Sequence, residues 1–155
     1  MVELKIIGKV KSKSGFEINI DRDYKEAMKG MDGFGHLIVI WWADKVDNSD
    51  FRKVTTTEKP YKAGPDTIGI FATRSPIRPN PIGISIIDVK CIDYDDGIIY
   101  TSYIDAEDET PVIDIKPYYP CSDIVREVKL PKWCEGLPNC IEDSANFDWS
   151  NFFNF

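Results

Sequence analysis

Hydrophobic and polar residues alternate over short stretches along much of the chain, as they do in β-strands with one buried face. The alternation is partial in residues 5–11 and 16–20, and the sequence Ser12–Gly15 between them is typical of a turn. Residues 36–43 (HLIVIWWA) form a continuous apolar run of strand length, which predicts a core strand covered on both faces. Residues 23–31 instead space their apolar side chains at helical intervals, so they predict one short helix.

The strand pattern continues in residues 68–115. Further strands are predicted at residues 68–73, 83–93, 98–104 and 112–115. The apolar phase shifts within residues 83–93, which predicts a β-bulge near Ile86 and Ile87. Tyr94–Gly97 is a tight-turn sequence, whereas residues 45–66 show no period and predict a long exposed connection. Many short strands beside one helix favour a mostly-β fold, either a barrel or a sandwich, over a parallel α/β sheet.

The strand-like pattern ends at Pro120. Residues 122–129 predict a helical turn or two, and residues 147–155 contain five aromatic side chains. Aromatic side chains at this density predict a contact surface, either within the monomer or against another chain. We therefore divide the sequence into a barrel domain, residues 1–120, and an irregular, acidic and aromatic C-terminal extension, residues 121–155. The extension is expected to pack on the barrel or on a homodimer partner.

Length and composition are those of a single globular domain. The chain has 155 residues, of which 43% are hydrophobic and 29% charged. No apolar run reaches the ~18–20 residues of a membrane span. The first residues lack the apolar stretch of a signal peptide, so a cytoplasmic protein without membrane contact is expected.

Charge is distributed unevenly along the chain. The net charge is -7, which argues against indiscriminate nucleic-acid binding. Residues 52–90 nevertheless carry 7 basic and 3 acidic side chains, whereas residues 91–155 carry 4 and 14. The basic stretch could meet an anion, although its charges could also be scattered over the surface.

Residues 72–83 (ATRSPIRPNPIG) contain three prolines and two arginines between two predicted strands. Proline fixes φ and keeps the preceding residue extended, so the loop holds Arg74, Arg78 and Asn80 with little entropy left to lose on binding. Arginine offers a fork of donors to carboxylate or phosphate, and asparagine can donate and accept. The loop therefore predicts an anion or cofactor site; a purely structural proline-rich crossing is the alternative.

Residues 105–119 (DAEDETPVIDIKPYY) combine four carboxylates in five residues with a polar alternation. In a strand Asp114, Lys116 and Tyr118 would share one face, where they could accept a proton, pair with charge and stack on a ring. The alternative is a solvated sheet face with an ordinary Asp–Lys pair.

These two segments carry a resemblance to a known family. Phe71–Ser85 (FATRSPIRPNPIGIS) and Asp114–Pro120 (DIKPYYP), together with Gly30–His36 and Ile7–Val10, resemble the TrmO family of S-adenosylmethionine-dependent tRNA methyltransferases over roughly residues 5–120. The resemblance implies a mostly-β fold, a small single-sheet β-barrel that is usually dimeric and binds S-adenosylmethionine outside a Rossmann fold. It also implies methylation of the exocyclic amine of threonylcarbamoyl-modified adenosine beside the tRNA anticodon, with the anticodon stem-loop as partner.

The resemblance also implies site residues. Cofactor contacts are expected at Asp44, Lys45, Arg74, Ile84, Asp108, Glu109, Thr110 and Pro111. The positive charge of residues 52–90, rather than the resemblance, predicts contacts to tRNA at Arg78, Lys59 and Lys62, and further contacts are expected at Asn80 and Lys116. From side-chain chemistry, Asp114 could accept a hydrogen bond from the amine and Tyr118 could stack on the base. Family members commonly have glycine where Glu109 stands, and many have a longer loop where Ser12–Gly15 joins the first strands.

The other reactive side chains predict no site. His36 is the single histidine and begins the most apolar strand, which favours a structural role. The four cysteines lack close Cys-x-x-Cys pairing, so reduced thiols and no metal site are expected. Trp41 and Trp42 are core candidates, but one of the two rings must face away and could line a pocket. Two other functions stay open: a methyltransferase for another amine, and a cofactor-binding module without activity.

Overall fold

The computed structural model describes all 155 residues and is built mostly from β-strands. The strands are β1 (Gly8–Lys11), β2 (Phe16–Ile20), β3 (His36–Trp42), β4 (Thr56–Glu58), β5 (Thr67–Gly69), β6 (Ile82–Asp88), β7 (Cys91–Asp93), β8 (Ile98–Thr101) and β9 (Pro111–Pro117). The two α-helices, α1 (Pro120–Asp123) and α2 (Ile141–Ser144), are single turns. The mostly-β class predicted from the sequence is confirmed.

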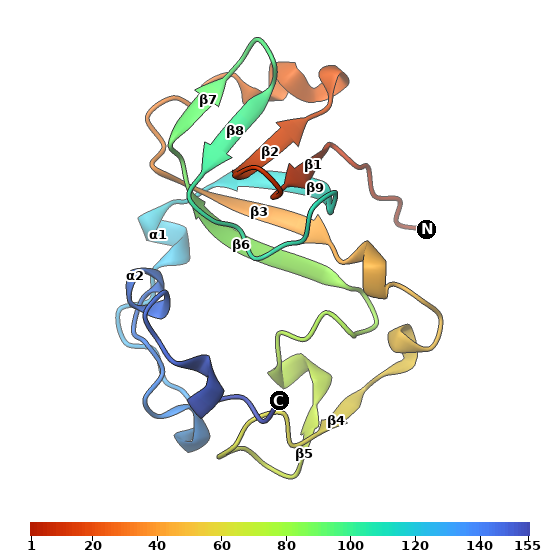
Figure 1. The fold of residues 1–155 in the computed structure, drawn as a ribbon, viewed down its shortest axis with the longest axis vertical. Helices are drawn as coiled ribbons and strands as arrows, with labels where there is room; N and C mark the ends of the chain where they lie inside the picture. The colour runs from red at the N-terminus through yellow and green to blue at the C-terminus, as the bar shows by residue number, and fades with distance from the viewer.

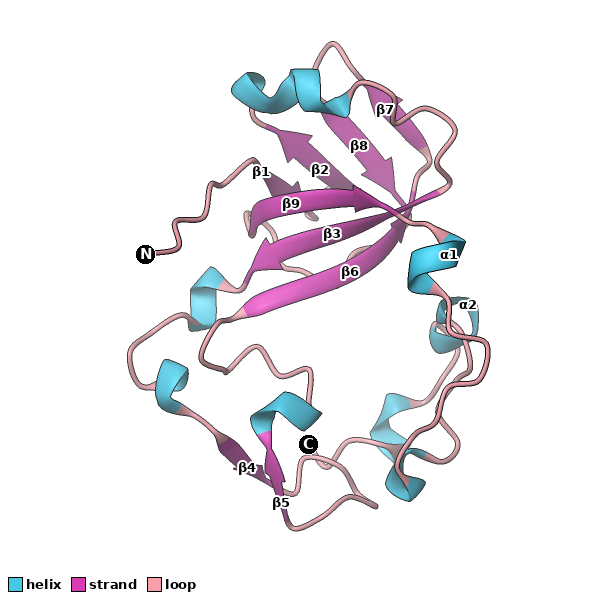
Figure 2. Cartoon of the chain, turned by 180° about the vertical axis from the view of Figure 1, so that it is seen from behind, coloured by secondary structure: helices cyan, strands magenta, loops and turns pink.

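Seven strands form one curved antiparallel sheet in the order β6-β3-β9-β1-β2-β8-β7 (Figure 1). The edge strands β6 and β7 follow one another along the chain but do not pair with each other, so a closed barrel is not confirmed. The remaining strands, β4 and β5, form a separate two-stranded sheet at the far end of the molecule (Figure 2). The expectation of a single sheet was therefore wrong.

Alternating side chains of the curved sheet form the core. On β1 and β2, Val10 and Ile18 are fully buried, and their neighbours in the sequence are more exposed. The same alternation places Leu37 and Val39 of β3 in the core. The buried cluster consists of Val10, Ile18, Ile20, Met28, Leu37, Val39, Ile87, Ile99, Ile104 and Val112. Period-two patterning thus selected the core correctly.

The predicted strand at residues 83–93 is two strands separated by a corner. The register between β3 and β6 runs without a break from Trp42 opposite Ile82 to His36 opposite Asp88, so the bulge predicted near Ile86 was wrong. The apolar phase changes because the chain turns after Asp88, whose carboxylate accepts hydrogen bonds from the Thr101 hydroxyl (2.8 Å) and the Ser102 amide (2.9 Å).

The helical predictions were right in place but not in type or length. The short helix is the 3₁₀-helix η1 (Arg22–Met28), and the predicted turns at residues 122–129 reduce to α1. None of the helices has the length and apolar character needed to cross a membrane.

The predicted connection at residues 45–66 is not fully irregular, because it contains η2 (Asp44–Val46), η3 (Phe51–Lys53) and β4. The predicted strand at 68–73 is likewise split between β5 and η4 (Ile70–Ala72).

An aromatic cluster ties the C-terminal extension to the loop between β4 and β5. Its members are Tyr61, Trp133, Phe147, Trp149, Phe152, Phe153 and Phe155. Tyr61 stacks on Trp133 with ring centroids 4.8 Å apart and forms an isolated β-bridge with Phe153. The Lys62 amide also donates to the Phe152 carbonyl at 3.0 Å. The aromatic end thus has its contacts within the same chain, beside the β4–β5 sheet.

We expect the corner at Asp88 to make folding stability depend on pH. Burial disfavours its charge, but hydrogen bonds from Ser102 and Thr101 outweigh burial and hold the pKa of Asp88 at about 2. A depressed pKa contributes stability above the usual aspartate value of about 3.9, and that stability is lost as the pH falls toward 2. Asp88→Asn should cost about 1 kcal/mol at pH 7, allowing for solvent screening, and flatten the profile below pH 4.

Urea unfolding at pH values from 7 to 2.5 measures this effect. Asp23→Asn, an exposed change in η1, serves as the control for altered net charge. Equal acid sensitivity of the wild-type protein and Asp88→Asn would contradict the assignment.

Candidate functional site

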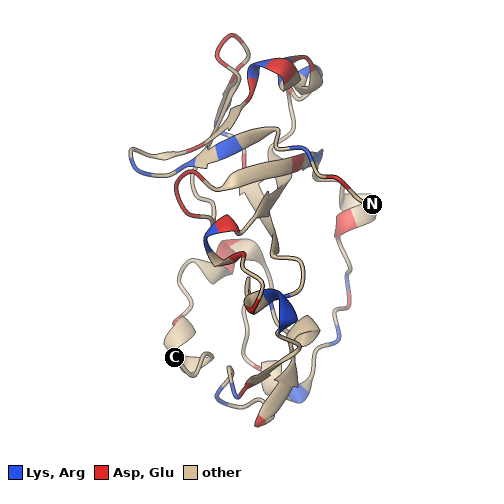
Figure 3. Cartoon of the chain, turned by 90° about the vertical axis from the view of Figure 1, so that its right-hand side faces the viewer, with Lys and Arg blue, Asp and Glu red and all other residues tan.

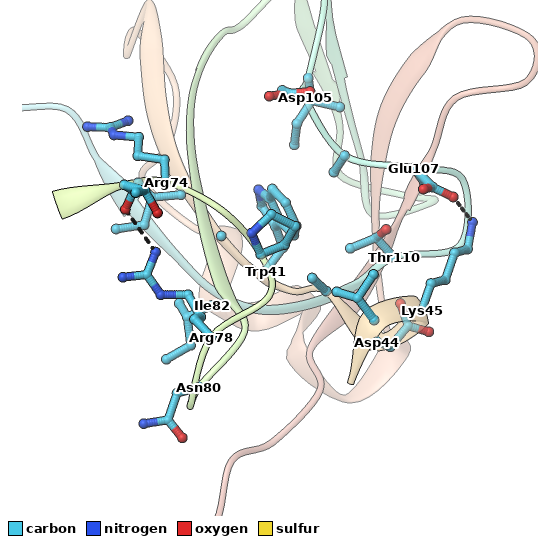
Figure 4. A pocket seen from close by; sticks show the side chains of 18 of the residues that line it. Trp41, Asp44, Lys45, Arg74, Arg78, Asn80, Ile82, Asp105, Glu107 and Thr110 are labelled. Carbon is cyan, nitrogen blue, oxygen red and sulfur yellow. Dashed lines mark hydrogen bonds and ion pairs between the residues drawn. The ribbon is translucent and has the colours of Figure 1, made fainter. Parts of the chain in front are cut away.

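A cleft of about 1070 Å³ lies along the unpaired edge of β6. The residues that line it come from β3 and η2, from the proline-rich loop before β6, from β6 itself and from the segment Tyr103–Glu107 (Figure 4). The Ala43 amide donates to the Pro81 carbonyl and the Val89 amide to the Gly35 carbonyl, so every second residue pair between β3 and β6, counted from these, is hydrogen-bonded. Ile84 belongs to a pair that is not hydrogen-bonded. By that alternation the amide and carbonyl of Ile84 point away from β3, toward the open edge.

The Trp41 indole forms the floor of the cleft. Trp41 lies opposite Gly83 in the β3–β6 pairing, and a Cβ on Gly83 would come within 2.2 Å of the indole. Only glycine therefore lets the ring lie flat over β6. The indole Nε1 donates to the Ser85 hydroxyl at 3.0 Å. The β3–β9 register shifts between Ile40 and Trp41, so an irregularity of the ladder lies beside the floor.

The expectation that one tryptophan would line a pocket is met by Trp41. The Trp42 indole donates to Asp47 at 2.9 Å instead. Hydrogen bonds from Arg52 and from Trp42 lower the pKa of Asp47 to about 2. Trp42 is thus part of a charged cluster outside the cleft.

The proline-rich loop supplies the basic side of the cleft. Arg74, Arg78 and Asn80 lie together on one side of Trp41 (Figure 4). The Arg78 guanidinium donates to the carbonyls of Thr73 and Ser75, at 3.2 and 3.3 Å. The guanidinium of Arg74 has no hydrogen-bond or ion-pair partner in the chain, so its donors are free for a ligand.

The opposite side of the cleft is acidic. Lys45 forms an ion pair with Glu107, and that hydrogen bond raises the pKa of Lys45 above its usual value. Asp44 and Asp105 also line the cleft, and neither forms an ion pair. The sequence reasoning did not select Asp105 or Glu107, although both belong to the run of four carboxylates that it noted.

The turn Asp108–Pro111 is divided between the cleft and the protein surface. Thr110 lines the cleft and is 3% exposed. Asp108 accepts a hydrogen bond from the Ser12 amide at 2.9 Å and pairs with Lys13. Asp108, Glu109 and Pro111 do not line the cleft, so their cofactor contacts stay a prediction.

Glu109 has a backbone φ of 68°, a left-handed conformation that favours glycine. Its carboxylate pairs with Lys9 and Lys11, and these hydrogen bonds lower the pKa of Glu109. The conformation is the one expected of the family's glycine. Unlike glycine, the glutamate also connects this turn to β1 through its two ion pairs.

The two side chains predicted to act in catalysis lie outside the cleft in this chain. Asp114 pairs with Lys116 at 2.7 Å, and its other oxygen accepts the Ile115 amide at 2.9 Å. Tyr118 packs edge-on to His36, with ring centroids 6.3 Å apart. Asp114, Lys116 and Tyr118 are therefore not brought together with Arg74, and their roles remain predictions.

Ion pairs neutralise some of the basic side chains in residues 52–90. Arg52, Lys53 and Lys59 pair with acidic neighbours, whereas Lys62, Arg74, Arg78 and Lys90 form no ion pair. Lys59 and Lys62 lie on the β4–β5 loop rather than in the cleft. Figure 3 shows basic and acidic positions interspersed over both ends of the molecule. Within residues 52–90, the positive charge without an ion-pair partner is thus limited to four side chains.

The cleft suits a zwitterionic ligand with an aromatic ring. Arg74 can bind a carboxylate, Asp44 and Asp105 can attract cationic groups, and the Trp41 indole offers a flat apolar surface. S-adenosylmethionine has all of these groups, so the residues present fit it. The structure contains no cluster of His, Cys, Asp and Glu side chains arranged to hold a metal ion.

Comparison with known proteins agrees with the motifs. The family model of the tRNA-methyltransferase O N-terminal domain matches residues 6–124. The chain is 36% identical over 120 residues to the tRNA (adenine(37)-N6)-methyltransferase of Escherichia coli, which covers 75% of this chain and 50% of that protein. It is 34% identical over 113 residues to an S-adenosyl-L-methionine-binding protein of Archaeoglobus fulgidus, covering 73% and 76%.

Another relative and two solved structures extend the comparison. A probable S-adenosyl-L-methionine-binding protein of A. fulgidus is 35% identical over 127 residues, 82% of this chain but 32% of that protein. The chain thus spans about a third of this relative and half of the E. coli protein. The fold matches the crystal structure of TrmO from Pseudomonas aeruginosa with a TM-score of 0.62 at 24% identity, covering 83% of this chain and 61% of that one. Another crystal structure of TrmO gives a TM-score of 0.66 at 23% identity, covering 84% and 63%.

The resemblance noted in the sequence is thereby confirmed by a family model that covers most of the chain and by relatives more than 30% identical to it. The chain belongs to the tRNA-methyltransferase O family, and the matched part is that family's N-terminal domain.

Proposed function

We propose that this protein is an S-adenosylmethionine-dependent methyltransferase that acts on the exocyclic amine of a threonylcarbamoyl-modified adenosine beside the tRNA anticodon. The observation that carries the proposal is the cleft, which sets the unpaired Arg74 and the unpaired carboxylates on opposite sides of the Trp41 floor. The reaction and the tRNA substrate are taken from the family and from the name of the E. coli relative.

When bound, S-adenosylmethionine supplies an electrophilic methyl group on a sulfonium sulfur. Arg74 would hold its carboxylate, and Asp44 would attract its ammonium. Trp41, fixed by Gly83 and Ser85, gives the purine ring a flat surface. Because the Trp41 ring and the peptide groups beside Arg74 are held before binding, the chain contributes mainly alignment of the reacting atoms.

Methylation of an amine requires the loss of one proton. Asp105 is the carboxylate we favour as acceptor, since it lies in the cleft and forms no ion pair. Asp114, the base predicted from the sequence, is engaged by Lys116 and by the Ile115 amide. Tyr118 remains a candidate for stacking on the base, provided that the tRNA reaches the face beside His36.

A cofactor-binding module without catalysis is the second candidate. Two relatives from A. fulgidus are named only for binding S-adenosyl-L-methionine, and the chain spans 76% of one of them. Incubation with S-adenosylmethionine and total tRNA from cells that lack the methyl mark separates the two functions. Methyl transfer to that tRNA supports the enzyme, whereas binding without transfer supports the module. Transfer to small amines alone would favour a methyltransferase of another specificity.

Arg74→Ala should weaken S-adenosylmethionine binding tenfold to a hundredfold. The expected loss is that of a charge-assisted hydrogen bond, about 1–3 kcal/mol. Calorimetric titration measures it, with Arg126→Ala in the C-terminal extension as the control for lost positive charge. Unchanged affinity in Arg74→Ala would exclude Arg74 from the cofactor site.

We propose that Lys59 and Lys62 meet the tRNA anticodon stem-loop, together with Asn80 and Lys116. The two lysines lie on the loop that the aromatic cluster holds in place, and Lys62 has no acidic partner. Phosphate contacts contribute affinity by releasing counterions. Their loss should therefore weaken binding of all tRNAs alike.

Changing Lys59 and Lys62 together to Glu should weaken tRNA binding and reduce its salt slope by about 1 per lost phosphate contact. Lys5→Glu with Lys29→Glu makes the same change in net charge at exposed positions at the other end of the molecule. Tight binding and full methylation at physiological salt in the Lys59 and Lys62 variant would mean that tRNA docks elsewhere.

We propose a homodimer whose interface is the isoleucine face, the outer face of β3 and β6. This face consists of Ile38, Ile40, Ile82, Ile84 and Ile86. Ile38 pairs with Ile86 and Ile40 with Ile84, whereas Ile82 lies opposite Trp42. Ile84 is 58% exposed and Ile82 is 40% exposed in the single chain. The β3 sequence predicts a strand covered on both faces, and a second copy would provide the missing cover.

Ile38→Lys with Ile86→Lys should therefore convert the dimer to a monomer, because two charges would be buried at the interface. Sedimentation velocity at high micromolar concentration measures the mass. Val125→Lys, at an exposed position in the extension, is the control. A wild-type chain that sediments as a monomer would contradict the proposal.

A further inference from the structure

The Arg78 guanidinium is engaged by the loop that carries Arg74. Its Nη1 donates to the Thr73 carbonyl at 3.2 Å and to the Ser75 carbonyl at 3.3 Å. These carbonyls belong to the residues on either side of Arg74. Both hydrogens of Nη1 are thus used, one on each side of Arg74, whereas the donors of Nε and Nη2 remain available.

Hydrogen bonds from the side chains of Thr73 and Ser75 to nearby backbone groups also hold this loop. The Thr73 hydroxyl, in a residue only 7% exposed, donates to the Ile70 carbonyl at 2.8 Å and accepts the Ser75 amide at 3.2 Å. The Ser75 hydroxyl accepts the Ile77 amide at 3.2 Å. Pro76 and Pro79 restrict the remaining torsions. The backbone at Arg74 is therefore fixed on both sides, and Arg78 is the one charged group in this network.

We propose that Arg78 is a positioning residue for Arg74 rather than a contact to tRNA. It holds the two peptide groups that flank Arg74, so that the Arg74 guanidinium meets an anionic ligand without first ordering its own backbone. This role rests on the proposed binding of S-adenosylmethionine and departs from the tRNA contact that the positive charge of residues 52–90 predicted for Arg78.

A double-mutant cycle on cofactor affinity tests the coupling. Arg78→Ala should weaken S-adenosylmethionine binding about tenfold, a change of about 1.4 kcal/mol. Because Arg78 acts through Arg74, the variant with both arginines changed to Ala should bind no more weakly than Arg74→Ala alone. Additive losses would overturn the proposal. If Arg78→Ala does not fold, Arg78→Lys replaces it in the cycle, since lysine keeps the charge but not the planar fork.

The salt dependence of tRNA binding separates positioning from phosphate contact. Arg78→Ala should leave the salt slope unchanged, and a slope reduced by about 1 would overturn the proposal. Methylguanidinium added to Arg78→Gly should restore part of the cofactor affinity. No restoration would count against the carbonyl contacts.

A measurement without ligand distinguishes failure of this inference from failure of the proposed function. Amide hydrogen exchange of residues 73–78 should be faster in Arg78→Ala than in the wild-type protein, with exchange in β3 unchanged. This result holds even if the wild-type protein binds no S-adenosylmethionine, in which case only the proposed function fails. Equal exchange in the two proteins would overturn the positioning role.

Discussion

The contact between the Trp41 indole and the backbone of Gly83 is the constraint on which the cleft depends. The ring lies where a side chain at position 83 would otherwise stand, and Ser85 fixes its rotation through Nε1. A large flat surface that also packs against the core is thereby held beside the edge strand β6. Arg74, Asp44 and Asp105 line the same cleft around this floor, so one ligand can contact all three.

The open sheet and the cleft have the same cause. A barrel closed between β6 and β7 would use the outer edge of β6 for strand pairing, and that edge is the one along which the cleft lies. An unpaired edge strand with apolar residues is ordinarily prone to aggregation, so it needs a partner or a cover. Here the segment Tyr103–Glu107 stands opposite the edge across the cleft, and a ligand bound between them could use the free main-chain groups of Ile84.

Local patterns predicted the strands and the basic side of the cleft, because period two and the stiffness of proline are properties of neighbouring residues. Arg74, Asp44 and Thr110 were found through motifs. The acidic side was missed at Asp105 and Glu107, since it forms only when residues more than sixty positions apart, such as Lys45 and Glu107, meet. The corner after Asp88 likewise depends on residues distant in the sequence, because Thr101 and Ser102 donate hydrogen bonds to its carboxylate. From the sequence alone, the change of apolar phase there was interpreted as a bulge.

The chain's negative charge acts together with its few free cations. Carboxylates outnumber basic groups and repel nucleic acid, so in the proposed complex a phosphate contact is most favourable at a cation that forms no ion pair, such as Lys62. Repulsion elsewhere on the surface lowers affinity for every RNA, but it lowers affinity least for one that reaches such a cation. Selectivity between RNAs therefore requires no extended basic surface. A preorganised cleft on an acidic protein can select one RNA because charge repulsion disfavours most other binding orientations.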